Sequence, residues 1–459
     1  MRNKPAGSRE RTVWIVVTAA LAAVIVLLSF TPRVLAGNRE AETQRLLAKF
    51  YEVFRFVQDN YVEELEPRVL MDGALKGVFE ALEDPHSAYL PAEDMRELED
   101  TTTGRFGGVG LIISKVERGV EVVSPIEDTP AYRAGVHAGD IIVAVDGSSV
   151  IDLNIDEVLS VLRGRPGTAV IMTILRGRSM RFDVQVVRAM IEVPTVKKAM
   201  IPGGIGYLRI IQFTPLTSER VENALAFFRD NGYRSLIVDL RSNPGGLLGG
   251  VIDVADFFLS RGPIVSTRSR VPAENNVFYA SSRNTIVPAE LPVVVLINRG
   301  SASASEILAG ALKDTGRATV MGETSYGKGS VQQIKRVNGA GFRLTMSRYF
   351  TPLGTNIDKV GILPDVAVAE PELTEAEEQA LSRLIEGNRI REFATANPEP
   401  SEAQIRSFVE SLAAEGLVLP ERYTRRLLRN EINRTNNDPP VYDLEYDLVL
   451  QRAVESLRN

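Results

Sequence analysis

The chain has 459 residues, 44% hydrophobic and 24% charged, which is long enough to bury cores in about two to four domains. Its net charge of -6, with Lys and Arg scattered along the chain, lacks the basic patch that a phosphate backbone requires, which argues against nucleic acid as a partner. The absence of cysteine excludes thiol nucleophiles, disulfides and Cys-ligated metals, and the two histidines, His86 and His137, show no metal-ligand spacing.

The N-terminus is predicted to be a targeting segment. Four basic residues within the first 11 positions precede an uninterrupted apolar run, Val13 to Phe30, which as a helix nearly spans the hydrocarbon layer of a membrane. Small residues around Ala36 suit a signal peptidase, so an uncleaved anchor over 13–36 and a removed signal both stay open. A buried core helix is the weaker alternative. The charge bias places residues 1–12 in the cytoplasm and everything after Gly37 outside it.

Four regions with different patterns follow. Apolar residues at helical spacing between Ala41 and Leu82 predict two or three short helices in a helical region over 37–103. Short β-rich runs with glycine turns and one helix predict a small β domain over 104–190, and alternating strands and helices predict an α/β domain over 191–369. The charged segment 370–459 is predicted to be a helical extension that contacts a partner or a second copy. The expected strands are Val109–Ile113, Val120–Val123, Ile141–Val145, Ala169–Leu175 and Arg181–Val187, then Ile205–Ile211, Ser235–Leu240 and Pro292–Ile297; the expected helices are Ile155–Leu162, Glu219–Asn231 and Ser305–Lys313.

A candidate nucleophile lies in the α/β domain. The segment from Asn298 to Ile307 has the pattern of a strand, a tight turn of small residues and a helix. This arrangement directs backbone N–H groups and the positive end of a helix dipole at one point, which suits a developing oxyanion beside the hydroxyl of Ser303. The alternative is that Ser303 or Ser305 only caps the helix.

Lys328 is the candidate base, because neither histidine lies in the α/β domain. It is flanked by glycines that let backbones approach closely, and a desolvated lysine can deprotonate a serine. Such a role requires burial to lower the lysine pKa by about three units from about 10.4. A solvated loop lysine is one alternative. A phosphate-binding loop is disfavoured, because Gly329 stands where Ser or Thr should bind magnesium and residues 331–337 have a strand pattern.

Residues 300–313 and 322–333 closely resemble the C-terminal processing (tail-specific) peptidases, whose pattern is a Ser-Ala-Ser-Ala-Ser-Glu run followed by a Gly-Lys-Gly loop. The resemblance implies Ser303 as nucleophile, Lys328 as base and Gln332 as the glutamine that orients the lysine. With further matches at 349–352 and 360–365, it covers about residues 45–370.

The segment from Asp239 to Gly246 resembles the oxyanion-side loop of the same family. Glycines carry no Cβ, so the N–H groups of Gly245 and Gly246, with that of Ala304, are implied to hold the oxyanion. A plain turn is the alternative. Two departures from the family pattern are the extension after Glu370 and Ser242, where many members carry Asn.

The β domain resembles a PDZ module, which binds a peptide as an added edge strand. The N–H groups of a glycine-rich loop can capture a terminal carboxylate, although the same stretch also suits an ordinary hairpin. The resemblance further implies that peptide binding activates the protease, in some members through an arginine, for which Arg163 is the candidate. His137 is expected on the surface of this domain and His86 in a structural turn. The glycine-rich loop consists of Gly107, Gly108, Val109, Gly110 and Leu111.

The resemblance therefore implies an α/β (α+β) multidomain fold with N-terminal helices, a PDZ β domain, a crotonase/ClpP-like protease core and a helical C-terminal extension, with no metal or organic cofactor. The expected function is an extracytoplasmic serine endopeptidase, on the cell membrane or secreted to the periplasm, that cleaves proteins or peptides with accessible C-termini. An adaptor or activator protein and a second copy of the chain are candidate partners. The alternative function is a non-catalytic PDZ scaffold that binds tails; another Ser–Lys acyl hydrolase is disfavoured because its Ser-x-x-Lys motif is missing.

Overall fold

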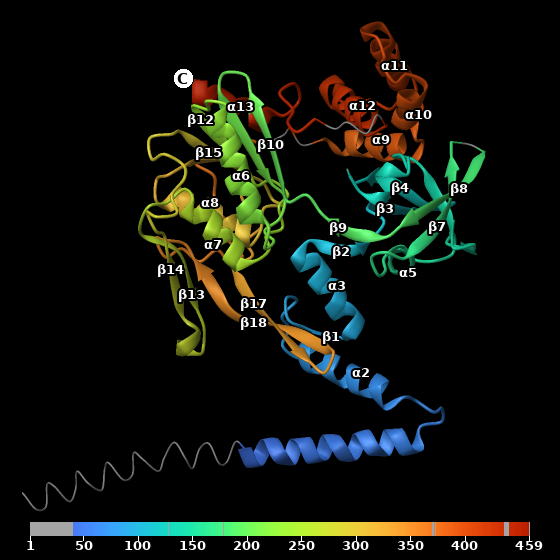
Figure 1. The fold of residues 1–459 in the computed structure, drawn as a ribbon, viewed down its shortest axis with the longest axis vertical. Coiled ribbons are helices and arrows are strands. Elements are labelled where there is room, and N and C mark those ends of the chain that lie inside the picture. The colour runs from blue at the N-terminus through green and yellow to red at the C-terminus, as the bar shows by residue number, and fades with distance from the viewer. Residues whose placement is uncertain are drawn as a thin grey trace, which may run out of the picture. The chain divides into compact units, whose positions relative to one another are not determined.

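The computed structural model describes residues 40–126, 128–177, 179–369, 371, 373–435 and 440–458. The predicted targeting segment over 13–36 lies outside these residues. Within them, no helix is both long and apolar enough to cross a membrane. The chain divides into two compact units, Met1–Tyr89 and Leu90–Asn459 (Figure 1).

The described part of the first unit holds two helices, within the predicted two or three. They span residues 40–60 and α2 (Pro67–Glu80), and the short strand β1 (Ala88–Leu90) follows. Pro67 suits the first turn of α2, because its missing N–H would find no partner within the helix. Asp84 forms the predicted turn, since its carboxylate accepts the His86 N–H at 3.0 Å and the Ser87 hydroxyl at 2.6 Å.

The β domain is an antiparallel sheet in the order β3-β4-β5-β7-β8, with β6 paired to β5. The predicted helix α5 (Ile155–Leu162) has the expected bounds and begins with a reciprocal capping box between Asn154 and Glu157. The first strand begins at Leu111 instead of Val109, because Gly110 turns the chain with a φ of 86°. The strands are β3 (Leu111–Val116), β4 (Gly119–Pro125), β5 (Ile141–Val145), β6 (Ser148–Ser149), β7 (Ala169–Arg176) and β8 (Met180–Val187).

Short elements surround this sheet. The helix α3 (Ala92–Thr103) precedes it, and the short helix α4 (Pro130–Arg133) lies between β4 and β5 in the chain. The strands β2 (Arg105–Gly108) and β9 (Ala189–Glu192), which flank the domain in sequence, pair antiparallel with each other. His137 is exposed on this domain, as expected.

The α/β domain is built on a sheet in the order β10-β11-β12-β15-β16-β19, in which only the β10–β11 pair is antiparallel. Its parallel strands are nearly uninterrupted apolar runs, as expected where both faces are covered. The strands are β10 (Val196–Ile201), β11 (Ile205–Ile210), β12 (Ser235–Asp239), β15 (Val293–Ile297), β16 (Thr319–Gly322) and β19 (Val366–Ala367).

Alternate strand residues point to opposite faces of this sheet, and each face has its own helices. One face packs against α6 (Thr217–Asp230), α7 (Leu248–Asp256) and α8 (Ala304–Asp314). The other face packs against α13 (Leu448–Arg458), the last helix of the chain. The first face includes Leu208, Leu236, Val238 and Val295; the second includes Tyr207, Ile237, Val294 and Leu296.

Antiparallel pairs of long strands extend from this core (Figure 1). The strand β18 (Ala340–Phe350) pairs with both β17 (Ser330–Val337) and β13 (Pro263–Arg268), and β13 pairs with β14 (Asn276–Tyr279). The single-turn helix η1 (Pro272–Glu274) joins β13 to β14. The predicted strand pattern of residues 331–337 is therefore observed as β17.

The segment after residue 370 is helical, but it is not one extension. The helices α9 (Glu375–Glu386), α10 (Arg389–Ala396), α11 (Glu402–Ala414) and α12 (Glu421–Thr435) share an apolar cluster of their own, which includes Leu384, Phe408 and Leu428. By contrast, α13 completes the protease core. The predicted single extension over 370–459 is therefore wrong in this respect, because its apolar residues belong to two separate clusters.

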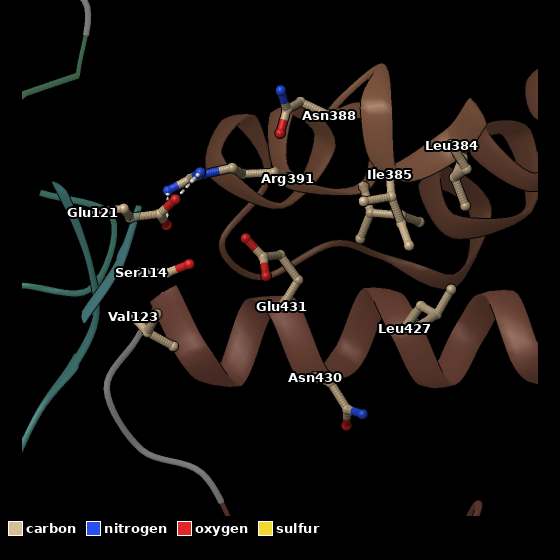
Figure 2. A pocket seen from close by; sticks show the side chains of 11 residues that line it. Ser114, Glu121, Val123, Leu384, Ile385, Asn388, Arg391, Leu427, Asn430 and Glu431 are labelled. Atoms are coloured by element: carbon tan, nitrogen blue, oxygen red, sulfur yellow. Dashed lines mark hydrogen bonds and ion pairs between the residues drawn. The ribbon is translucent and has the colours of Figure 1, made fainter. Parts of the chain in front are cut away.

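The helices α9 to α12 also contact the β domain. Arg391 of α10 donates to both oxygens of Glu121 of β4, at 3.0 and 2.5 Å. This ion pair lies beside a cavity of about 450 Å³. The cavity is lined by Val123 of the β domain and by Ile385 and Leu427 of the C-terminal helices, among others (Figure 2). Charge-assisted bidentate pairs of this kind add geometric specificity as well as energy.

Candidate active site

Ser303 lies at the tight turn between β15 and α8, as the strand–turn–helix pattern predicted. It is 8% exposed and has a φ of 54°, a conformation that favours glycine and strains other residues. Its N–H donates to the carboxylate of Glu306 at 2.7 Å. A strained serine at the start of a buried helix is the local geometry expected for a nucleophile beside a helix dipole.

The carboxylate of Glu306 joins the two predicted catalytic loops. Glu306 is fully buried, and its Oε2 accepts the N–H of Ser303 at 2.7 Å and that of Lys328 at 2.9 Å. Its Oε1 accepts the Gly327 N–H at 2.7 Å and the Ser325 hydroxyl at 2.6 Å. Four donors satisfy the buried carboxylate, which fixes the serine turn against the lysine loop.

Lys328 is half-buried in the loop before β17. The loop is closely packed, because a Cβ on Gly329 would lie 2.3 Å from the Asp358 nitrogen. Gln332 lies on β17, as its predicted strand required, and its Nε2 donates to the Ser330 hydroxyl at 2.8 Å. The structure thus places Ser303 and Lys328 on loops tied by one carboxylate, with Gln332 on the adjoining strand.

The loop from Asp239 to Gly246 lies against the serine turn. A Cβ on Gly245 would stand 2.8 Å from the Ser303 Cβ and 2.9 Å from the Ala304 nitrogen. The Gly245 N–H donates to the side chain of Asn243 at 2.8 Å. Among the described residues, the N–H groups of Gly246 and Ala304 have no hydrogen-bond acceptor. In this conformation, Gly246 and Ala304 are therefore the two predicted oxyanion donors that remain available to a ligand.

Tyr349 is a site residue that the sequence analysis did not assign. Its side chain is 4% exposed and is hydrogen bonded to the side chain of Ser303, and its backbone N–H donates to Gly329 at 2.7 Å. Burial raises the pKa of Tyr349 to about 12, although the hydrogen bond to Ser303 acts to lower it. The hydroxyl therefore keeps its proton at neutral pH.

The strand β3 forms an edge of the β-domain sheet, so one row of its backbone groups is available for pairing. The glycine-rich loop leads directly into this edge. Among the described residues, the N–H groups of Val109 and Gly110 have no acceptor. The Val109 carbonyl accepts the Ala131 N–H and the Gly110 carbonyl accepts the Ile126 N–H, each at 2.9 Å. An edge strand preceded by unpaired N–H groups can accept an extended peptide and its terminal carboxylate.

Arg163 follows α5 and lies beside this loop. Its guanidinium carbon lies 5.1 Å from the centre of the Phe106 ring, and its Cα would lie 3.7 Å from a Cβ on Gly108. A cation over an aromatic ring at this distance is a favourable contact. The predicted activating arginine thus touches the strand β2 that carries Gly107 and Gly108.

The described residues hold no cluster of three or more His, Asp or Glu side chains that could bind a metal ion. Ser303 stands at the start of α8 against the backbone of Gly245, an arrangement in which a serine hydroxyl can attack a carbonyl while backbone dipoles stabilise the oxyanion.

Family models match three parts of the chain. The peptidase family S41 model matches residues 204–368 and the PDZ domain model matches 121–176, and both ranges fall inside the predicted α/β and β domains. The model of the activating protease CtpB N-terminal domain matches residues 31–94.

Curated relatives named as carboxy-terminal processing proteases match this chain over most of their length. The carboxy-terminal-processing protease of Bartonella bacilliformis is 43% identical over 341 residues, which cover 73% of this chain and 77% of the relative. The carboxyl-terminal-processing protease of Synechocystis is 34% identical over 391 residues, covering 81% and 91%. Among solved structures, a photosystem II D1 C-terminal processing protease shares 30% identity with a TM-score of 0.43, covering 70% of this chain and 92% of that one.

The family model and the curated relatives favour the protease over the scaffold interpretation, because the S41 model covers the α/β domain that carries Ser303 and Lys328. The chain belongs to the carboxy-terminal processing proteases of peptidase family S41, and it is a serine-type protease with a PDZ domain and an α/β multidomain fold.

Proposed function

We propose that the chain is an extracytoplasmic endopeptidase that uses a Ser303–Lys328 dyad and selects substrates by their C-terminal tails. The main support for the dyad is the buried Glu306 carboxylate, which accepts the backbone N–H of Ser303 at 2.7 Å and that of Lys328 at 2.9 Å. A fully buried carboxylate with four donors is a rigid support. It keeps the serine turn and the lysine loop in one fixed relation.

In the proposed mechanism, neutral Lys328 takes the hydroxyl proton of Ser303 as the serine oxygen attacks the scissile carbonyl. The carbonyl oxygen becomes an oxyanion, which the N–H groups of Gly246 and Ala304 stabilise. Lysine then protonates the leaving amine, and the acyl-enzyme forms. A water molecule, deprotonated in the same way, releases the second product and restores Ser303. Gln332 orients the lysine.

We propose that the peptide tail pairs with β3 and that its carboxylate binds the loop Gly107–Leu111. The free edge of β3 and the unpaired N–H groups of Val109 and Gly110 support this mode. Arg163, in contact with Phe106, is the proposed link between an occupied tail site and the protease. Substrates are then proteins or peptides whose C-termini are accessible.

The dyad is tested with the full chain purified in detergent micelles and an unfolded substrate such as β-casein. We expect the wild type to degrade casein and Ser303→Ala and Lys328→Ala to lose activity while keeping their circular dichroism. Cleavage that survives in Ser303→Ala contradicts the dyad. Binding of tails by all three proteins without cleavage by any would favour the scaffold function.

Tail selection is tested with two peptides that differ only at the C-terminus. We expect the peptide with a free carboxylate to bind and to be cleaved, and its C-terminal amide to lose at least about tenfold in affinity, because a charged acceptor is lost. Equal binding of acid and amide would contradict carboxylate capture by the β domain.

The extracytoplasmic location is proposed from the basic residues before the apolar run Val13–Phe30. Protease added to intact spheroplasts should digest a C-terminal tag on the chain, because that tag lies outside the membrane. Protection of the tag until the membrane is dissolved would contradict this location. The mobility of the mature chain on a gel would also distinguish an anchor from a cleaved signal.

A further inference from the structure

The start of α13 contacts the loop that carries the oxyanion glycines. Asp447 immediately precedes α13, and its Oδ1 accepts the Leu450 N–H at 2.9 Å, as a carboxylate at a helix N-terminus does. The two oxygens of Asp447 also accept Nη1 and Nη2 of Arg241 at 2.8 and 2.6 Å. The two residues are 206 positions apart in the sequence. The last helix of the chain is therefore joined to the active-site loop by a bidentate ion pair.

On its other side, the Arg241 guanidinium donates to Asp239 at the end of β12. Nη2 lies 2.6 Å and Nε 3.0 Å from its oxygens, and the Arg241 backbone N–H donates there at 3.0 Å. Asp239 is 1% exposed and also accepts the Tyr207 hydroxyl at 2.7 Å. Burial acts to raise the pKa of Asp239, but the charge and hydrogen bonds of Arg241 keep it below its usual value.

The position of Arg241 is transmitted to the serine turn by its neighbours in the loop. Ser242, with a φ of 58°, donates its N–H to the Asn298 side chain at 2.7 Å. The Asn243 carbonyl accepts the Ala302 N–H and the Ser305 hydroxyl, each at 3.0 Å. A shift of Arg241 would therefore move the loop relative to the turn that holds the nucleophile.

We propose that Asp447 is a positioning residue, which through Arg241 holds the loop Asp239–Gly246 where the Gly246 N–H faces the oxyanion. This inference rests on the proposed roles of Ser303 and Gly246. It makes α13 a part of the catalytic apparatus, because the residue that begins α13 is ion paired with the loop that carries Gly246. The position of an oxyanion donor affects the transition state more than substrate binding.

The test uses Asp447→Asn in the full chain. The amide keeps the size of the side chain and its cap to α13 but removes the charge and one acceptor for Arg241. We expect kcat to fall about tenfold with KM within about twofold of the wild type, a loss of about 1.4 kcal/mol in transition-state stabilisation. Asp447→Glu keeps the charge and should recover most of the loss in kcat.

The matched control is Val454→Ala, which removes buried apolar atoms from the same helix, at a residue 4% exposed, and leaves the ion pair. Both variants should lower Tm, but only Asp447→Asn should lower kcat. An unchanged kcat in Asp447→Asn, or an equal loss of kcat in Val454→Ala at a similar Tm, would overturn the inference. Activity that survives in Ser303→Ala would instead overturn the proposed function, so the two failures are distinct.

Discussion

The Oε2 atom of Glu306 lies 2.9 Å from the backbone nitrogen of Lys328, although the two residues belong to separate loops. The same atom accepts the Ser303 N–H, so one buried oxygen is shared by the turn of the nucleophile and the loop of the base. The negative charge of Glu306 is needed to hold the two loops together, because a glutamine amide in its place would direct N–H donors at groups that are themselves donors.

Glu306→Gln is therefore expected to lower kcat by at least about 100-fold, the scale of a misplacement of about 1 Å between reacting groups. Steady-state cleavage and labelling of Ser303 by a fluorophosphonate would measure the loss. Glu222→Gln, an exposed change on α6, is the control and should keep full activity. Near wild-type labelling of a folded Glu306→Gln variant would contradict the role given to this carboxylate.

Two glycines of neighbouring segments should respond in opposite ways to a methyl group. Gly245 has a φ of 102°, and its added Cβ would lie 2.7 Å from the Ala302 carbonyl oxygen, so Gly245→Ala must distort the serine turn. Gly249 lies in α7 with nothing within 4 Å of an added Cβ. We expect Gly245→Ala to abolish measurable cleavage.

Gly249→Ala should keep activity and raise the free energy of unfolding by up to about 1 kcal/mol, because alanine favours the helix. Denaturant unfolding of both variants, with cleavage assays in parallel, would measure the contrast. If Gly245→Ala retained activity, the loop could accommodate a methyl group at this position, and the close contact with Ala302 would not constrain the serine turn.

Local patterns predicted part of the described elements, among them nine strands and three helices with approximate bounds. The predicted bounds of Ile155–Leu162 are those of α5, whose first turn is fixed by a capping box between Asn154 and Glu157. Three strands of the core sheet, β11, β12 and β15, were predicted as short apolar runs, and their ends agree within one residue. Ser242, which departs from the resembled family pattern, has a φ of 58°, a conformation that Asn tolerates better than Ser.

The parts that were missed depend on contacts between distant segments. By its place in the sequence Glu306 is an acid in the first turn of α8, and only the approach of the segment Ser325–Lys328 adds three donors to the N–H of Ser303. The pattern of α13 indicates an amphipathic helix, but no local signal tells which surface its apolar side covers. Arg241 and Asp447 could not be paired from the sequence for the same reason.

Tyr349 should contribute to a loss of stability at alkaline pH. Burial raises its pKa to about 12, so between pH 10 and 12 the folded protein retains a proton that the unfolded chain loses. The unfolded state then binds fewer protons, and the free energy of unfolding falls as pH rises, by about 1.4 kcal/mol per pH unit for one group. Below pH 10 the contribution is fully present.

Tyr349→Phe removes this titration, so its stability should decline less steeply than that of the wild type between pH 9 and pH 11. Urea unfolding midpoints of both proteins at pH 9 and pH 11 would measure how much each loses in stability. The other tyrosines contribute equally in the two proteins, so the difference between the losses reports on Tyr349. Parallel decline in both proteins would show that Tyr349 ionises as readily in the folded as in the unfolded state.

The ion pair of Arg391 and Glu121 joins α10 to the β domain. The side chains are 33% and 15% exposed, so the pair is partly shielded from solvent. Reversing one charge places like charges together, whereas exchanging both restores the attraction. Arg391→Glu and Glu121→Arg should each increase hydrogen exchange in α10 and β4, and the double exchange should return it toward the wild-type rate.

Arg389→Glu provides the control on the same helix, because Arg389 pairs with Glu415 of the C-terminal helices and not with the β domain. It should change exchange in α10 and leave β4 unaffected. A coupling energy of about 1–3 kcal/mol between Arg391 and Glu121 would agree with a bidentate, partly buried pair. If the effects of Arg391→Glu and Glu121→Arg were additive in the double variant instead, the ion pair would not hold the helices to the β domain in solution. Apolar contacts such as those of Val123 would then have to hold them.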